Sequence, residues 1–203
     1  MCGRFTLLTD LSVIEGVDPA EESASEFQPS NNICPGQQIP AIIYDEKIRL
    51  VTFRWGLIPA WARDPSLGHK LINARAETIA TKPSFRDAFK KRRCLIIADG
   101  FYEWSKGDKK TPYHFSLKSG ASFCFAGLYE AWLSPEKKTI KTCAIITTDA
   151  NVLLKQIHDR MPVIVPKDKE ALWLDPGTRN PEEWAALLQP YPAEDMQMTT
   201  GWR

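Results

Sequence analysis

Cys2 is the residue whose position in the chain offers the most distinctive chemistry. Because Cys2 and Gly3 are small, Met1 is a good substrate for methionine aminopeptidase, and its removal leaves an N-terminal cysteine. Such a residue carries an amine with a pKa of about 7.7–8.0 beside a thiol with a pKa of about 8.5. The thiolate can attack a carbonyl carbon with the amine as its base. Alternatively, the amine condenses with an aldehyde and the thiol closes a five-membered thiazolidine, a step that proximity favours. Cys2 is also compatible with a small hydrophobic side chain at the start of a strand.

Two further side chains are suited to proton transfer. Glu103 lies among aromatic residues in Phe101-Tyr102-Glu103-Trp104, surroundings that raise a carboxyl pKa and suit a general acid or base. His158 lies between a helical pattern and a strand, and imidazole is the side chain that exchanges protons near neutral pH. Both also have structural interpretations, Glu103 as an edge-strand residue facing water and His158 as a residue satisfied within the fold.

An amide and a guanidinium occur two residues apart in Leu71-Ile72-Asn73-Ala74-Arg75. In an extended segment the side chains of Asn73 and Arg75 point to the same face, so both can contact one ligand. The alternative is a capped loop that carries a surface arginine.

These residues belong to a chain of 203 residues with 43% hydrophobic and 25% charged side chains, the composition of a globular protein. The net charge of +1 gives no support to a polyanionic partner by itself. However, residues 47–93 carry twelve basic and three acidic side chains, whereas residues 1–46 carry one basic and eight acidic. The run Lys90-Lys91-Arg92-Arg93 follows a helical pattern and is interpreted as a solvated helix C-terminus. Arg54, Arg63 and Arg75 lie among Trp and Pro residues and are better candidates for binding an anion.

The elements that must position these side chains are mostly strands. Segments rich in β-branched and aromatic residues predict strands at 2–8, 39–44, 47–58, 93–104, 112–118, 121–133, 138–147 and 161–165. Short helices are predicted at 10–16, 82–91, 150–157, 167–173 and 181–188, the last with Asn180 as its N-cap. Turns at 106–109 and 117–120 join strands as hairpins. Residues 1–203 are therefore predicted to form one α+β domain with a mainly antiparallel β core.

Nothing in the sequence predicts a membrane segment, a disulfide framework or a metal site. The longest apolar runs, such as residues 95–98, are far shorter than the ~20 residues of a membrane helix. The N-terminus lacks the apolar core of a signal peptide. Five cysteines without a C-x-x-C pair and three histidines without ligand spacing indicate neither disulfides nor a metal, and no cofactor is indicated. We therefore expect a cytoplasmic protein with reduced thiols.

Six blocks follow one another between residue 2 and about residue 165. They are Cys2-Gly3-Arg4-Phe5, Asn32-Ile33-Cys34-Pro35-Gly36, Trp55-Gly56-Leu57-Ile58-Pro59, Ile72-Asn73-Ala74-Arg75-Ala76-Glu77, Ala98-Asp99-Gly100-Phe101-Tyr102-Glu103-Trp104 and Ile157-His158-Asp159-Arg160-Met161-Pro162. In this order the blocks resemble the SOS response-associated peptidase family, whose members process abasic sites in DNA. The resemblance covers most of the chain, and the six blocks together are highly specific.

The resemblance implies a compact, barrel-like α+β fold and a role in binding single-stranded DNA that contains abasic sites. Family members trap the abasic sugar as a thiazolidine crosslink to the N-terminal cysteine, which implies that Cys2 is the nucleophile. Carried over by motif, Asn73 orients the ring-opened sugar, Glu103 transfers protons and His158 assists imine formation. The implied DNA contacts are Arg4, Asn32, Pro35, Trp61, Arg75 and Thr147. We expect a monomer that associates with the nucleoid when bound to DNA.

The implied chemistry agrees with that of the residues. An abasic deoxyribose is partly an open-chain aldehyde, the electrophile that an aminothiol prefers. Its imine can undergo β-elimination, so a weak lyase activity is expected, whereas ring closure by the thiol prevents that elimination. The crosslink does not require the peptidase activity that the family name includes. The basic block 47–93 is expected to follow the phosphates, with Trp55 and Trp61 as stacking faces. Both tryptophans are also compatible with core positions, and Trp55 is expected in the core.

Three features depart from the family pattern. Cys34 replaces a small residue without a thiol, and near Cys2 it could form an inhibitory disulfide. Ala62 stands where some relatives carry a second aromatic that wedges between bases, which puts the wedge in doubt. The chain ends at Arg203, where relatives usually continue with another strand, so the C-terminal sheet edge is expected to be open or differently supplied.

Two other functions are compatible with parts of the pattern. Glutamine-dependent amidotransferases also begin Met-Cys-Gly, and such an enzyme hydrolyses an amide without a lasting DNA adduct. A non-catalytic single-stranded DNA binding module is the second alternative, and its function does not depend on the Cys2 thiol.

Overall fold

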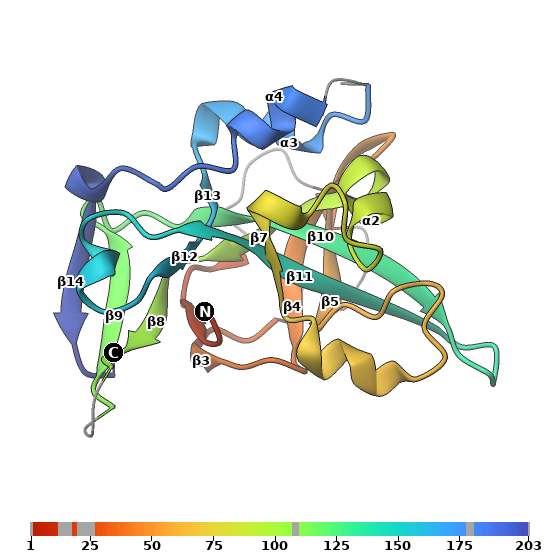
Figure 1. Ribbon diagram of the computed structural model, residues 1–203, viewed down its shortest axis with the longest axis horizontal. Helices are drawn as coiled ribbons and strands as arrows, with labels where there is room; N and C mark the ends of the chain where they lie inside the picture. Colours follow the sequence, from red (N-terminus) through yellow and green to blue (C-terminus); the bar gives the residue numbers. More distant parts are fainter. Residues whose placement is uncertain (1, 12–17, 20–26, 107–109, 178–180, 203) are drawn as a thin grey trace.

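Figure 1 shows the computed structural model, which describes residues 2–11, 18–19, 27–106, 110–177 and 181–202. The described part forms one compact α+β domain that is mostly β, as the sequence predicts. No helix in these ranges is long and apolar enough to cross a membrane.

A closed barrel forms the centre of the described structure. Its strands are β4 (Gln38–Asp45), β5 (Lys47–Trp55), β7 (Arg93–Ala98), β10 (Phe123–Leu133) and β11 (Thr139–Asp149). Antiparallel pairs join β5 to β4, β4 to β7, β7 to β10 and β10 to β11. A parallel pairing of β11 with β5 closes the ring and leaves no open edge there. The implied barrel-like, mainly antiparallel core is confirmed.

A second sheet lies at one end of the barrel (Figure 1, left). Its order is β14 (Met196–Thr200), β9 (Pro112–Leu117), β8 (Gly100–Trp104), β1 (Phe5–Leu7) and β3 (Ser30–Ile33). The predicted strand over residues 93–104 is wrong, because the chain leaves β7 and enters β8 at Asp99. The Asp99 carboxylate accepts hydrogen bonds from the backbone N–H groups of Leu8 and Thr9, and from the Thr9 hydroxyl at 2.7 Å. These bonds fix the corner between the two sheets.

The remaining elements are short. They are β2 (Asp18–Pro19), β6 (Asn73–Arg75), β12 (Arg160–Pro162), β13 (Ile164–Val165), α2 (Arg86–Lys91), α3 (Glu170–Leu174), α4 (Pro181–Ala186) and 3-10 helices at Pro65–Lys70, Ala76–Thr78, Leu154–Gln156, Lys167–Lys169 and Ala193–Asp195. Helices α2 and α3 pack on β7, and α2 also packs on β10 (Figure 1). The predicted helix 150–157 is only the 3-10 turn at Leu154–Gln156. The Asn180 cap and most of the predicted helix 10–16 and of the turn 106–109 lie outside the described residues.

The predicted strand 47–58 ends early, at Trp55. Gly56 has a φ of +129°, and a Cβ there would lie 2.7 Å from the Gly68 carbonyl oxygen. Only glycine tolerates both the conformation and the close approach. The turn directs Trp55 into the core, as expected, where it is 1% exposed and contacts Phe5 edge-on at 5.4 Å.

The interpretation of Lys90–Arg93 as a solvated run is wrong for its last two residues. Arg92 forms an ion pair with Glu130 at 2.7 Å. Arg93 is 6% exposed, donates hydrogen bonds to the carbonyls of Phe89, Lys90, Trp173 and Asp175, and lies 3.5 Å from the Trp184 ring centroid. Burial lowers the pKa of Arg93 to about 10. These two arginines stabilise the fold, so fewer cations of the basic block are available to bind an anion than the sequence count indicates.

The edge of β9 is covered by a C-terminal strand, which itself ends the strand order of this sheet. Residues 196–200, for which no strand was predicted, form β14 and pair with β9 from Met196 opposite Leu117 to Thr200 opposite Tyr113. The turn at 117–120 forms, with a hydrogen bond from the Gly120 N–H to the Leu117 carbonyl. The predicted hairpin is wrong, because β9 pairs with β8 and β14 whereas β10 belongs to the other sheet.

Candidate active site around Cys2

Cys2 lies fully buried just before β1. Its thiol donates to the Arg4 carbonyl at 3.9 Å, and its own carbonyl accepts a hydrogen bond from Asn73 Nδ2 at 2.8 Å. Burial raises the pKa of the Cys2 thiol well above its usual range, and the Glu103 carboxylate raises this pKa further. The thiol is therefore held in its protonated form beside two of the other candidate residues.

Asn73 is positioned by the short strand β6. Ile72 anchors this strand, because its carbonyl accepts hydrogen bonds from Trp55 Nε1 at 2.9 Å and from the Ile145 N–H at 3.1 Å. Ala74 is buried in the core. Of the two residues that flank it, Asn73 is partly exposed and Arg75 is exposed. The prediction that Asn73 and Arg75 share a face is consistent with this alternation.

Two buried acceptor atoms near this strand have no hydrogen-bond partner among the described residues, namely Asn73 Oδ1 and Thr147 Oγ1. Both belong to one stretch of sheet, since Asn73 pairs with Ile145 of β11 and Arg75 pairs with Thr147. An unpaired buried polar atom costs about 1–3 kcal/mol. Such atoms are expected where a ligand supplies the missing bonds.

Glu103 extends from β8 and is 3% exposed. Burial raises the pKa of the Glu103 carboxyl, and the nearby His158 acts in the opposite direction. A carboxyl with a raised pKa is suited to exchanging a proton near neutral pH. The prediction from its aromatic surroundings therefore agrees with its position, and the edge-strand alternative is wrong.

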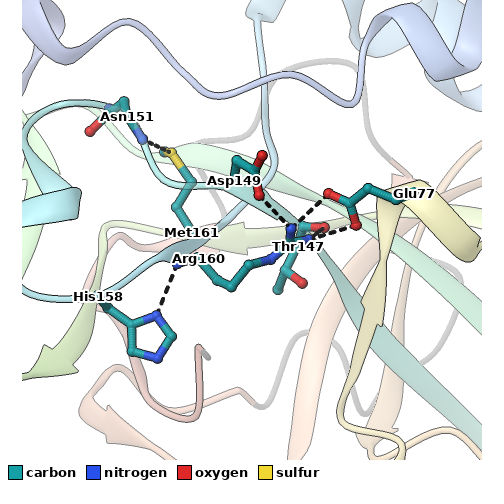
Figure 2. Close-up of polar contacts among 7 residues, drawn as sticks. All are labelled: Glu77, Thr147, Asp149, Asn151, His158, Arg160 and Met161. Carbon is teal, nitrogen blue, oxygen red and sulfur yellow. Dashed lines mark hydrogen bonds and ion pairs between the residues drawn. The ribbon is translucent and has the colours of Figure 1, made fainter.

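His158 follows the 3-10 turn at Leu154–Gln156, and its N–H donates to the Leu154 carbonyl at 2.8 Å. Its Nδ1 accepts a hydrogen bond from the Arg160 N–H at 3.0 Å (Figure 2). An imidazole nitrogen that accepts carries no proton, so the ring proton lies on Nε2. The loop therefore fixes which nitrogen can donate.

Arg4, Asn32 and Cys34 form a second cluster where β1 pairs with β3. Arg4 Nη1 donates to Asn32 Oδ1 at 2.9 Å, and the Cys34 thiol donates to the same oxygen at 3.6 Å. Pro35 is exposed in the following turn, which Gly36 permits with a φ of +91°. The structure thus brings together three of the residues implied in DNA contact.

Sequence reasoning did not identify the aromatic residues around Arg4. The Arg4 guanidinium lies 5.5 Å from the Trp202 ring centroid and 5.9 Å from that of Trp104. Trp202 is 54% exposed and packs against Tyr102 with ring centroids 4.8 Å apart. A solvent-exposed tryptophan after the last strand is the signal that could have indicated this contact.

The remaining candidates lie around two surface hollows. One, of about 570 Å³, is lined by Arg75, Glu77, Thr78, Asp149, His158, Asp159 and Arg160. The other, of about 440 Å³, is lined by Trp61, Ala62, Arg63, Asp64, Ser66, Leu67 and Lys70. Trp61 is 58% exposed and donates a hydrogen bond to the Pro83 carbonyl. The next residue is a buried alanine, so position 62 does not supply a second aromatic ring beside Trp61. Among the described residues, the hydrogen bond of Trp61 goes to Pro83 and not to the residues around Cys2.

All five cysteines are free thiols. Within the described ranges, no group of three His, Cys, Asp or Glu side chains is arranged to hold a metal ion.

Comparison with known proteins places these features in a family context. The sequence model of the family described as SOS response associated peptidase (SRAP) matches residues 1–200. The chain is 49% identical over 202 residues to "Abasic site processing protein YoqW" of Bacillus subtilis (strain 168), covering 97% of this chain and 90% of that relative. It is 30% identical to "Abasic site processing protein HMCES" of Xenopus tropicalis, covering 82% of this chain and 60% of that protein.

Solved structures show the same fold. A protein from Bacteroides thetaiotaomicron superposes with a TM-score of 0.91 at 30% identity, covering 98% of this chain and 91% of that chain. A protein from Bordetella bronchiseptica superposes with a TM-score of 0.82 at 26% identity, covering 98% of this chain and 99% of that chain.

Proposed function

The chain belongs to the SOS response-associated peptidase family, and from this premise we propose that it processes abasic sites in single-stranded DNA by forming a covalent thiazolidine crosslink through Cys2. The relatives named abasic site processing proteins support the substrate class. The observation that carries the proposal is a chain of contacts around Cys2: Asn73 donates to the Cys2 carbonyl, Glu103 lies close enough to raise the pKa of the Cys2 thiol, and His158 lies close enough to Glu103 to act on its pKa.

The reaction begins with removal of Met1, which leaves the Cys2 amine as the N-terminus. This amine attacks the aldehyde carbon of the ring-opened sugar and, with loss of one water, forms an imine. The Cys2 thiol then adds across the C=N bond, so that sulfur bonds to carbon and nitrogen takes up a proton. Burial raises the pKa of the thiol, and the amine is therefore the first nucleophile, with the thiol second.

The neighbouring side chains divide the proton transfers. Glu103, whose pKa burial raises, protonates the hydroxyl that leaves as water and later accepts the thiol proton. His158 donates from Nε2 to the sugar oxygen, because its Nδ1 is already an acceptor. Asn73 holds the Cys2 carbonyl through Nδ2 and offers its buried Oδ1 to a sugar hydroxyl.

The DNA strand on either side of the lesion contacts basic and polar residues around these groups. In the proposal, phosphates contact Arg4 and Arg75, and Asn32 and Pro35 line the path beside Arg4. The Thr147 hydroxyl donates to a phosphate or sugar oxygen at the other side, and Trp61 stacks on a base further along. Such backbone contacts are sequence-independent and salt-sensitive.

Two side activities follow from the same intermediate and the same thiol. An imine that is not closed by sulfur can lose a proton and the 3′ phosphate by β-elimination, which is a lyase reaction. Peptidase activity at Cys2 requires the thiolate to attack an amide, and the raised thiol pKa disfavours this reaction. We therefore propose the crosslink as the main activity, with a slow lyase reaction beside it.

The experiment is incubation of the purified protein with single-stranded DNA that bears one abasic site, followed by a denaturing gel. The wild type is expected to give a shifted covalent band that Cys2→Ser removes. DNA with an intact base is the matched control and is expected to give no band. Noncovalent binding without a band would support a plain binding module, and hydrolysis of glutamine without a band would support the amidotransferase alternative.

A further inference from the structure

The two segments that carry Asn73 and His158 lie on opposite edges of one strand. Thr147 of β11 pairs with Arg75 of β6 on one edge and with Pro162 of β12 on the other. Asn73 begins β6, and His158 lies two residues before β12. The distance between Asn73 and His158 therefore depends on how β6 and β12 are held against β11.

The Arg160 side chain joins these two edges (Figure 2). Arg160 begins β12, and its guanidinium makes a two-pronged contact with Glu77, which follows β6: Nη1 to Oε1 at 2.7 Å and Nη2 to Oε2 at 3.0 Å. Its Nη2 also donates to the Thr147 carbonyl at 2.6 Å, on the strand between them. The planar fork of arginine suits a bidentate carboxylate, and a lysine cannot reproduce it.

The contact between Arg160 and Glu77 is less exposed to solvent than a surface ion pair. The Arg160 side chain is 14% exposed and Glu77 is 49% exposed. The hydrogen bonds from Arg160 lower the pKa of Glu77, which keeps its carboxylate charged. Asp149 also accepts from Nη1 at 2.8 Å, but it lies directly opposite Arg160 in the β11–β12 pair.

The backbone of Arg160 has a second role, because its N–H donates to His158 Nδ1 at 3.0 Å. The same residue thus orients the imidazole through its main chain and connects to the segment carrying Asn73 through its side chain.

We propose that Arg160 and Glu77 form a clamp across β11 that positions His158 and Asn73 relative to each other for the reaction at Cys2. The inference rests on the proposed crosslinking function. Both are positioning residues, because Arg160 acts through His158 and Glu77 acts through Arg160 and the β6 segment.

The clamp predicts a specific kinetic effect. Loosening it lets the two edges of β11 shift, and a misplacement of about 1 Å can lower a rate by about 100-fold. Glu77→Gln and Arg160→Lys are therefore expected to lower the first-order crosslinking rate constant at saturating protein by about 10- to 100-fold. The Kd for intact single-stranded DNA of the same sequence is measured for each variant, because Glu77 and Arg160 line the same hollow as Arg75 and a change of charge there alters affinity. Saturating protein then separates this effect from the change in the rate constant.

Two variants serve as controls. Asp149→Asn removes a carboxylate from the same guanidinium and leaves the Glu77 contact in place, and its effect on the rate constant is expected to be smaller than that of Glu77→Gln. Glu130→Gln breaks the ion pair with Arg92, far along the chain from these segments, and is expected to leave the rate constant unchanged. A purely structural role lowers Tm and the active fraction, but not the first-order rate constant of the active molecules.

The outcomes separate the two proposals. If the wild type forms no crosslink, the proposed function fails. If the wild type crosslinks and Glu77→Gln does so at the same rate constant, the clamp is wrong and the proposed function stands. Equal slowing by Glu130→Gln also overturns the clamp. If Arg160→Lys fails to fold, Glu77→Gln alone tests the clamp. The Glu77 side chain is half exposed and glutamine is nearly isosteric with it, so this variant is expected to fold.

Discussion

Glu103→Gln is expected to stabilise the protein while slowing its chemistry. Glu103 is 3% exposed, and burial raises the pKa of its carboxyl. The folded state therefore favours the protonated, neutral carboxyl over the charged one. Glutamine keeps the shape and cannot ionise, so the variant avoids the cost of holding that charge in the interior.

The sign and the pH window follow from linkage. Below about pH 4.3, the unfolded pKa of Glu, the carboxyl is protonated in both states and imposes no penalty. The penalty grows as pH rises towards the raised folded pKa and is constant above it. The stability advantage of Glu103→Gln is thus absent in acid and grows with pH until the pH exceeds the raised folded pKa.

The size of the effect follows from the penalty that burial places on the charged carboxylate, which is about 1–3 kcal/mol. For 203 residues, each kcal/mol raises Tm by about 2–4 °C. The same substitution removes the proton-transfer group, and the crosslinking rate constant is expected to fall by about 100- to 10,000-fold.

The assay is thermal unfolding of the wild type and Glu103→Gln between about pH 4 and about pH 8, together with the crosslinking rate. Glu130→Gln is the matched control, and it is expected to lower Tm. Glu130 forms an ion pair with Arg92 at 2.7 Å, so the protein loses stability when this carboxylate is neutralised. A lower Tm for Glu103→Gln at neutral pH, or a pH-independent gain, would refute the reasoning.

Three further predictions test other parts of the structure. Arg93→Met leaves four carbonyl groups without their donor and is expected to cost about 3–5 kcal/mol in chemical denaturation, with the Kd for DNA unchanged; a lower affinity of the folded variant would place Arg93 in the DNA interface instead. Trp61→Ala, at a side chain 58% exposed, is expected to weaken DNA binding by about 1–3 kcal/mol in fluorescence anisotropy with little change in Tm, whereas Trp55→Ala in the core should cost about 3–5 kcal/mol of stability; the reverse pattern contradicts both assignments. Arg75→Ala is expected to reduce the slope of log Kd against log salt by about 0.7, and an unchanged slope would remove Arg75 from the phosphate contacts.

Much of the fold follows from local sequence signals, and the exceptions have physical reasons. The barrel strands β4, β5, β10 and β11 are runs of β-branched and aromatic residues, so their positions were predictable. The corner at Asp99 was not, because the residues on both sides are equally apolar and the turn depends on hydrogen bonds to Leu8 and Thr9.

The short strands β6 and β14 were not predictable from the sequence for a different reason. Strands β6 and β14 contain few residues of high strand propensity, and each exists because it pairs with a longer strand, β11 or β9. Arg93 was interpreted as one of four solvated cations. Nothing in a run of basic residues indicates that one of them donates to four carbonyls and packs on a tryptophan ring.

The candidate site shows the same division. Cys2, Glu103 and His158 stood out by residue type and surroundings, and the structure places Glu103 close enough to affect the pKa of the Cys2 thiol and His158 close enough to affect that of Glu103. The contacts that hold them did not stand out, because the Arg160–Glu77 pair joins residues 83 positions apart in the chain. Trp202 beside Arg4 is another long-range contact of this kind.

The central claim is that the amine and the thiol of Cys2 close one ring on the abasic sugar. Mass analysis of the N-terminal peptide from the purified crosslink, after treatment with a thiol-alkylating reagent, tests it directly. Ring closure predicts a peptide beginning at Cys2 whose mass equals peptide plus sugar fragment minus one water, with no alkylated Cys2 thiol. An adduct on a lysine, or on Cys2 with its thiol still open to alkylation, would contradict ring closure.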